Sequence, residues 1–270
     1  MIHLRKIFHL ILRDLWTGLS YRLSLTLGIL SGIISLLQFA LLGYFLQEGN
    51  TFPGIASYGG NILAFLITGS VFTSFVGVAL SSFSGFLQSE QSMGTLEALL
   101  VSTTPLTRLM IYSGIASFIN TLVNTAILLG LLLYLFGVPL SINFTGVAVS
   151  LAALLFSLLG FGLMSTGILL VSKQGDPITW TLTTLTGLVS GVLYPVSILP
   201  PWLQNISYSL PTTQALEALR LSLLQNAGLE ALSTQLIALS AWGAASLPIG
   251  LIILRWGLKT ARLQGSLGEF

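Results

Sequence analysis

The sequence predicts an all-α integral membrane protein with six transmembrane helices. Of its 270 residues, 54% are hydrophobic and only 7% are charged, and the mean hydropathy is +0.93. A soluble domain usually carries about a quarter charged residues. So few charges cannot cover a water-exposed surface, so the chain is expected to cross a membrane several times. The spacing of the apolar runs and the positions of the basic residues predict the number and direction of these crossings.

Composition also limits the chemistry of the chain. It has no cysteine, which excludes disulfides, thiolate metal sites and cysteine nucleophiles. The two histidines, His3 and His9, fall on different sides of one helix, so no metal pair is expected. No Gly-x-x-x-x-Gly-Lys-Ser/Thr loop for ATP is present. We expect no catalytic, cofactor-binding or metal-binding residue. The net charge of +2 reflects basic residues at span ends and not binding to nucleic acid.

Residues 1–21 have the pattern of an amphipathic helix that lies in the membrane interface. Apolar residues recur at helical spacing on one side: Leu4, Ile7, Phe8, Ile11, Leu12, Leu15 and Leu19. The opposite side is polar and mostly basic: Arg5, Lys6, His9, Arg13 and Asp14. Such a helix rests among the membrane lipids with its basic side toward the headgroups.

The following apolar runs predict four membrane spans. Residues 23–46 carry no charge and would be about 36 Å long as a helix, enough to cross a bilayer. A loop leads to a second span at 62–83, which is rich in Gly, Ser and Thr. The next uncharged tract is too long for one span, and a Gly-Val-Pro turn divides it into spans at 109–136 and 144–171.

The last third of the chain predicts two more spans with short helices between them. A fifth span is expected at 178–199, and a Pro-Pro pair ends it. Residues 202–228 predict two short helices that dip into the edge of the outer leaflet. The second has a Thr cap and an i,i+3 pair of Glu217 and Arg220. A sixth span is expected at 232–254, broken or bent near Pro248.

The basic residues predict the orientation of these spans. With six spans, nine of the ten Lys and Arg residues fall on one side of the membrane and Arg220 alone falls on the other. The positive-inside rule then places both termini and the segments at 84–108 and 172–177 in the cytoplasm. The nine are Arg5, Lys6, Arg13, Arg22, Arg108, Lys173, Arg255, Lys259 and Arg262.

Residues 90–105 form the one polar segment between two long uncharged tracts. Ser92 or Thr95 can cap a short helix there, and Pro105 ends it. The apolar side of this helix carries Leu96, Leu99 and Leu100. A membrane protein that keeps such a segment in water is expected to bind a partner with it.

These residues resemble the ABC-2 type transporter permeases. The family pattern after the second span is matched by Glu90, Gly94, Thr95, Leu96, Glu97, Leu99, Leu100 and Pro105. A second match includes Tyr194, Pro195, Pro200, Trp202, Pro211, Glu217 and Arg220. An N-terminal helix that ends in Arg13-Asp14-Leu15 also fits, so the resemblance covers the whole chain.

The resemblance implies the transmembrane subunit of an ATP-driven exporter in a bacterial inner membrane. Segment 90–105 would be a coupling helix seated on a separate cytoplasmic ATPase, which binds the ATP and magnesium. The interfacial helix with Arg5, Arg13 and Asp14 would contact that ATPase too. A second permease subunit, identical or different, would complete the path, and the residues of the second match would form an outer gate. Substrate would pass by alternating access.

The residues alone leave other functions open. A secondary transporter or channel acting without an ATPase would need ionisable or ring-forming polar residues at mid-membrane, which the predicted spans lack. A scaffold that only anchors a partner would leave the Ser- and Thr-rich spans unexplained. For an exporter, such an uncharged path favours an amphipathic or lipid-like substrate: a drug, a lipid or a lipid-linked glycan. The pairs Gly28/Gly32 and Gly187/Gly191 predict close helix contacts, within one subunit or in a dimer.

Overall fold

The computed structural model describes residues 22–47, 61–95, 99, 101, 105–137, 140–172 and 176–263, which are mostly helical and contain no strand. The predicted interfacial helix at 1–21 lies outside these residues. In chain order the helices are α2 (Arg22–Gln47), α3 (Ile62–Ser92), α5 (Leu106–Phe136), α6 (Phe144–Ser172), α7 (Pro177–Val189), the 3₁₀ turn η2 (Val196–Ile198), α8 (Pro201–Ser209), α9 (Pro211–Leu224) and α10 (Ser233–Leu263).

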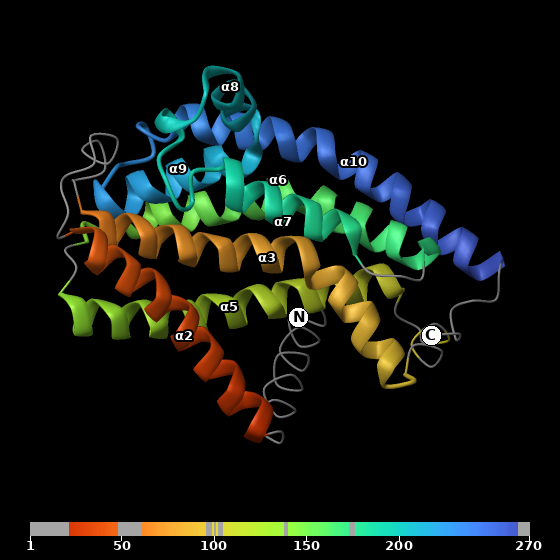
Figure 1. The fold of residues 1–270 in the computed structure, drawn as a ribbon. Coiled ribbons are helices and arrows are strands. Elements are labelled where there is room, and N and C mark those ends of the chain that lie inside the picture. The colour runs from red at the N-terminus through yellow and green to blue at the C-terminus, as the bar shows by residue number, and fades with distance from the viewer. Residues whose placement is uncertain are drawn as a thin grey trace.

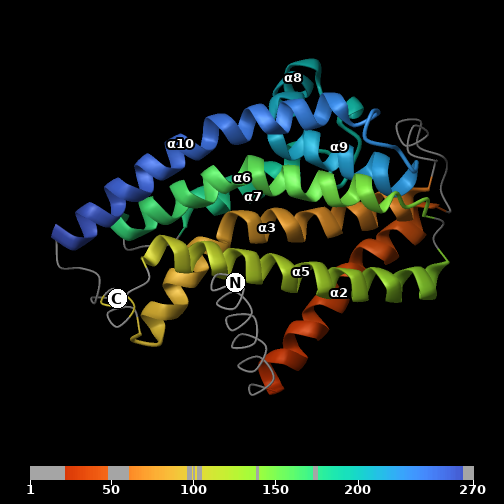
Figure 2. The same ribbon diagram turned by 180° about the vertical axis from the view of Figure 1, so that it is seen from behind.

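The long helices run side by side along a common axis. Helix α3 packs against α2, α5 and α6, and α6 packs against α10. Figure 1 shows α7 on the near face of this bundle, and Figure 2 shows α5 and α6 on the opposite face. Helix α2 diverges from the bundle axis in both views. The short helices α8 and α9 gather at the end where α10 begins.

The prediction of an all-α membrane protein is confirmed. Among the described residues, α3, α5, α6 and α10 are long and apolar enough to cross a membrane, and α2 contains a shorter apolar stretch, Leu30–Phe45. The predicted boundaries at Ile62, Phe136 and Phe144 match those of the helices. Helices α3 and α10 continue past the predicted spans to Ser92 and Leu263, and α10 stays helical through Pro248.

The predicted fifth span at 178–199 is wrong in its second half. Helix α7 has 13 residues, about 20 Å, and ends at Val189. Gly191 then adopts a φ of +84°, a left-handed conformation that glycine tolerates. The carbonyls of Gly191 and Val192 accept hydrogen bonds from Arg220, at 2.8 and 3.2 Å, so they do not continue the helix. High hydropathy continues through this break, which is why the sequence pattern hides it.

Close backbone contact between α6 and α10 depends on glycines spaced seven residues apart. A Cβ added to Gly250 would lie against the backbone of Gly160, and one added to Gly257 would lie against the backbone of Gly167. The predicted pair Gly187/Gly191 makes no such backbone contact among the described residues of this subunit, and a contact in a dimer stays a prediction. Nothing described lies within 4 Å of a Cβ at Gly187, and Gly191 lies beyond the end of α7.

Several Ser and Thr side chains of α3 form hydrogen bonds within the helix itself. The hydroxyls of Thr68, Ser70, Thr73 and Ser81 donate to backbone carbonyls three or four residues earlier, at 2.8–2.9 Å. Such bonds remove the cost of an unpaired hydroxyl in an apolar environment. Helix α3 can therefore be both polar in composition and buried in the bundle.

Helix α9 is buried, whereas both short helices were predicted at the leaflet edge. It packs against α3, α6 and α10, and its residues Leu216, Leu219 and Leu223 belong to the apolar core. The predicted Thr cap is also wrong, because Leu210 is the N-cap and has no side-chain cap bond. The hydroxyl of Thr212 instead pairs with that of Ser190, at 2.6 Å.

Candidate functional site

The end of α3 forms a tight turn built from the first residues of the polar segment. Gly94 has a φ of +68°, its N–H donates to the carbonyl of Gln91, and the N–H of Thr95 donates to the carbonyl of Glu90. This pair of bonds is the Schellman motif that commonly ends helices at glycine. The Thr95 hydroxyl also donates to the Glu90 carboxylate at 2.5 Å, and Glu90 is only 2% exposed. The turn therefore fixes where the rest of the segment begins.

The remaining described residues of the segment present both a buried and an exposed side. Leu99 packs against the apolar cluster formed by α3, α5, α6 and α10. Met93 and Val101 are 56% and 89% exposed. Pro105 is the N-cap residue of α5. Of the predicted coupling residues, Leu96, Glu97 and Leu100 lie outside the described residues. Among the described residues of the segment, Leu99 therefore packs against the bundle, while Met93 and Val101 stay exposed.

Asp176 joins three helices near the same end of the bundle. It is the N-cap of α7, and its carboxylate accepts the backbone N–H of Thr179 at 3.0 Å. It also accepts hydroxyl hydrogen bonds from Ser84 of α3, at 2.8 Å, from Thr179, at 2.7 Å, and from Ser165 of α6. Burial works to raise the pKa of Asp176, but the hydrogen bonds from Ser165, Thr179 and Ser84 favour the charged form. Together they hold the pKa below its ordinary value.

Arg220 occupies the opposite end of the bundle and is only 2% exposed. Its guanidinium lies 3.5 Å from the centre of the Phe65 ring, in a cation–π contact. Its nitrogens donate to the carbonyls of Gly191, Val192 and Phe65, at 2.8–3.2 Å, and to the Thr68 hydroxyl, at 3.5 Å. The arginine therefore ties α9 to α3 and to the loop after α7.

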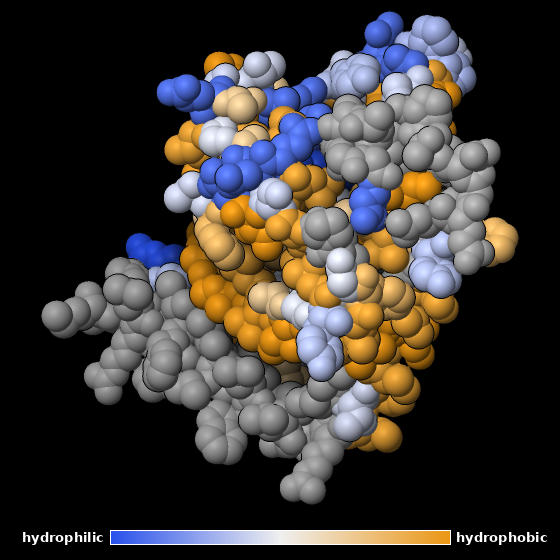
Figure 3. All heavy atoms as spheres, turned by 90° about the vertical axis from the view of Figure 1, so that its left-hand side faces the viewer, coloured by the Kyte–Doolittle hydropathy of each residue, from blue (hydrophilic) through white to orange (hydrophobic). Residues whose placement is uncertain are grey.

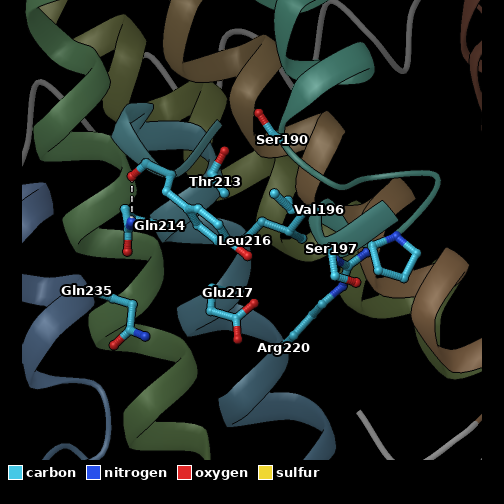
Figure 4. A pocket seen from close by; sticks show the side chains of 11 residues that line it. Ser190, Val196, Ser197, Thr213, Gln214, Leu216, Glu217, Arg220 and Gln235 are labelled. Carbon is cyan, nitrogen blue, oxygen red and sulfur yellow. Dashed lines mark hydrogen bonds between the residues drawn. The ribbon is translucent and has the colours of Figure 1, made fainter. Parts of the chain in front are cut away.

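A polar cavity of about 330 Å³ lies beside Arg220. Figure 4 shows Glu217 and Arg220 projecting from α9 toward it, with Gln235 on the other side of Glu217. Of the predicted gate residues, Pro195, Glu217 and Arg220 line this cavity. The Tyr194 hydroxyl donates to the Leu188 carbonyl, and Pro211 is buried at the start of α9. Pro200 and Trp202 are exposed, so the structure does not bring all seven together.

The polar clusters around Asp176 and around Arg220 thus lie at opposite ends of the helical bundle. In the described part, no group of three or more His, Cys, Asp or Glu residues could hold a metal ion. The family model for ABC-2 type transporters matches residues 6–224, well over half of the chain.

The chain belongs to the ABC-2 type transporter family. A search of curated proteins found no match. As an ABC-2 protein, the chain is a multi-pass membrane transport component, and membership of this family implies partnership with an ATP-binding subunit in general. The family match includes segment 90–105 and helix α9. The roles of single residues in these segments stay predictions.

Two residues of this ABC-2 protein are more important to the structure than the sequence pattern indicated. Asp176 was assigned only to a polar loop, although the Asp176-Pro177 pair is a recognisable helix start. Its partners Ser84 and Ser165 lie 92 and 11 residues away, so no local pattern could identify them. Arg220 was expected to pair with Glu217 on a surface helix. Its burial follows only from the packing of α9.

Replacing Asp176 with alanine is expected to lower the free energy of unfolding by about 1–2 kcal/mol at neutral pH, because α7 loses its N-cap acceptor. A lowered folded-state pKa stabilises the fold above the ordinary value of 3.8, and this stabilisation disappears as the pH falls through the folded-state pKa. Thermal unfolding in detergent should therefore show a lower unfolding temperature for Asp176→Ala than for wild type at pH 7, and this difference should become smaller in acid. The unfolding temperature of Asp176→Asn, which keeps a hydrogen-bond acceptor, should lie between those of wild type and Asp176→Ala. A difference independent of pH would contradict a role for the charge.

Proposed function

We propose that the chain is the transmembrane subunit of an ATP-driven exporter, coupled to a separate cytoplasmic ATPase through segment 90–105. The observation that carries this proposal is the turn at the end of α3. Glu90 and Thr95 hold the turn, while Met93 and Val101 leave apolar surface uncovered beside it. The positive-inside rule would place this segment in water on the cytoplasmic side, where a partner protein can contact these side chains. We expect the ATPase to cover them.

The proposal includes six membrane crossings with both termini in the cytoplasm. Helices α2 and α7 would supply the crossings beyond the four that are long and apolar enough by themselves. For α7, the loop and short helices that follow would complete the distance to the outer side. Arg108, Arg255 and Lys259 would then lie on the cytoplasmic side, as the positive-inside rule requires. A bacterial inner membrane fits this arrangement.

Substrate would pass between two such subunits, along α3 and α7. Small or hydroxylated residues on these helices are exposed, including Ser74, Gly85, Thr181 and Thr184. A path lined by hydroxyls and apolar groups without charge favours an amphipathic or lipid-like substrate, such as a drug, a lipid or a lipid-linked glycan. Closure of the ATPase dimer on ATP would switch the pair between inward- and outward-open states. The residues around Arg220 would form the outer gate.

One observation favours the second candidate, a secondary transporter that needs no ATPase. The Asp176 carboxylate lies between α3 and α6 and could exchange a proton or bind a cation. Its lowered pKa counts against proton exchange near neutral pH, because the group stays charged there. The exporter therefore remains the better supported function.

Co-purification with an ATPase tests the exporter. The tagged chain, extracted from its native membrane in mild detergent, should bring down a stoichiometric subunit with a Walker loop, identified by mass spectrometry. Gly94→Leu should reduce the amount of this subunit that co-purifies at least tenfold. The added side chain meets no described atom within 4 Å of its Cβ, so it would occupy the space that the ATPase is expected to fill. The left-handed strain costs only about 1–2 kcal/mol. Glu97→Lys should have a similar effect.

The control is Gly130→Leu, which adds the same side chain on α5 where nothing described lies within 4 Å of the new Cβ. It should leave the ATPase bound. All variants should insert into the membrane at wild-type levels. A chain that purifies alone, and moves solute in vesicles without ATP, would overturn the proposal in favour of the secondary transporter.

A further inference from the structure

The cavity beside Arg220 has features of a ligand site inside a single subunit. It lies between α9, the loop after α7 and the first turn of α10 (Figure 4). Its volume of about 330 Å³ is at the small end of the range for ligand pockets. A group of about one sugar ring fits better than a drug-sized molecule. Seen from the end where α10 begins, hydrophilic residues gather in the upper part of the coloured surface and hydrophobic residues prevail below them (Figure 3).

The unused hydrogen-bonding groups of the cavity are mainly acceptors. The Gln235 Oε1 atom is buried and has no hydrogen-bond partner. The Gln214 Nε2 atom donates to the Tyr208 carbonyl at 2.7 Å, which turns the Oε1 atom of the same amide away from that carbonyl. The Nε, Nη1 and Nη2 atoms of Arg220 all donate to protein groups already. A buried acceptor without a partner is costly, so a ligand that donates hydrogen bonds would be stabilising here.

The charges around the cavity select against a charged ligand. The Arg220 guanidinium would repel a cation, and the Glu217 carboxylate would repel an anion, since both line the same space. A neutral ligand with several hydroxyls meets neither repulsion. Its hydroxyls can donate to the glutamine and glutamate oxygens.

We propose that this cavity binds a neutral polyhydroxylated group, such as a sugar ring, through Glu217, Gln214 and Gln235. The ring is either a soluble polyol or the headgroup of a glycolipid. This inference does not rest on the exporter function, because binding needs no ATPase subunit. A chain that binds the sugar and purifies without an ATPase would contradict the proposed function and leave this inference intact.

Three sugars of one shape and different charge test the proposal. Glucose, glucosamine and glucuronate are titrated by saturation-transfer NMR against the full chain in nanodiscs that contain no sugar detergent. Glucose should bind, and glucosamine and glucuronate should bind at least tenfold more weakly. No glucose binding, or tighter binding of either charged sugar, would overturn the proposal.

Variants then locate the binding. Gln235→Leu removes the unpaired acceptor and should weaken glucose binding about three- to tenfold, while thermal stability stays the same or rises. A purely structural role for Gln235 would instead lower the stability. Gln88→Leu, on an exposed part of α3, is the matched control and should bind glucose normally. Equal glucose affinity in wild type and Gln235→Leu would overturn the assignment.

A comparison of glucose with octyl glucoside separates the two sources of the ring. If the alkylated sugar binds much more tightly in nanodiscs and loses affinity in Gln235→Leu, the site takes a glycolipid headgroup. If both bind equally and both respond to the variant, the site takes a soluble polyol. Binding of octyl glucoside that does not respond to the variant reflects partition into lipid and contradicts the proposal.

Discussion

Replacing Gly250 with valine is expected to separate α6 from α10 and to lower the free energy of unfolding by about 3 kcal/mol or more. A Cβ at this position would lie 2.9 Å from Cα and 3.0 Å from the carbonyl carbon of Gly160. These neighbours are backbone atoms, so no side chain can rotate away to make room. Relief requires a shift of one whole helix, which also breaks the equivalent contact between Gly257 and Gly167.

Thermal unfolding in detergent measures this effect, with Gly130→Val as the matched control. Both variants place the same β-branched residue in a helix, so the difference in intrinsic helix propensity is the same. Nothing described lies within 4 Å of a Cβ at Gly130. The control should therefore unfold near the wild-type temperature and Gly250→Val far below it. Similar midpoints for the two variants would mean that the close α6–α10 approach does not stabilise the protein.

The spacing that produces this contact is visible in the sequence once the fold is known. Gly243, Gly250 and Gly257 are each seven residues apart on α10, and Gly160 and Gly167 have the same spacing on α6. Hydropathy locates helices because it responds to every residue of a span. It does not distinguish a glycine at a helix contact from one that faces lipid. From the sequence alone, the pairs Gly28/Gly32 and Gly187/Gly191 were therefore as good candidates for helix contacts as the glycines spaced seven residues apart.

The break after α7 shows a second limit of sequence patterns. Residues 190–199 are as apolar as a span, yet a distant arginine accounts for where the carbonyls of Gly191 and Val192 point. Buried backbone groups must find partners, and here Arg220 supplies them from 28 and 29 residues away. Local helix propensity and hydropathy contain no information about hydrogen-bond partners that are so far away in the sequence. The turn from Glu90 to Thr95, by contrast, is held by hydrogen bonds between near neighbours in the sequence, and the coupling role of segment 90–105 stays a prediction.

Replacing Arg220 with methionine is expected to lower the free energy of unfolding by about 3–5 kcal/mol, the usual cost of removing one member of a buried charged network. Methionine keeps most of the aliphatic volume but donates no hydrogen bond. The carbonyls of Phe65, Gly191 and Val192 would lose their donors, and the Phe65 ring would lose its cation. Arg220→Lys should restore only part of the stability, because an ammonium group cannot reach all of these acceptors in a fixed planar geometry.

Hydrogen exchange of residues 190–199 separates this local effect from general damage. In Arg220→Met these amides should exchange faster than in wild type even under conditions where the α6 and α10 amides stay protected, because the loop loses the hydrogen bonds from Arg220 on α9. Arg255→Met is the matched control, since Arg255 is exposed on α10 and should tolerate the change. Unchanged exchange in Arg220→Met would show that other groups hold the loop. In that case Arg220 would not be the residue that ends α7.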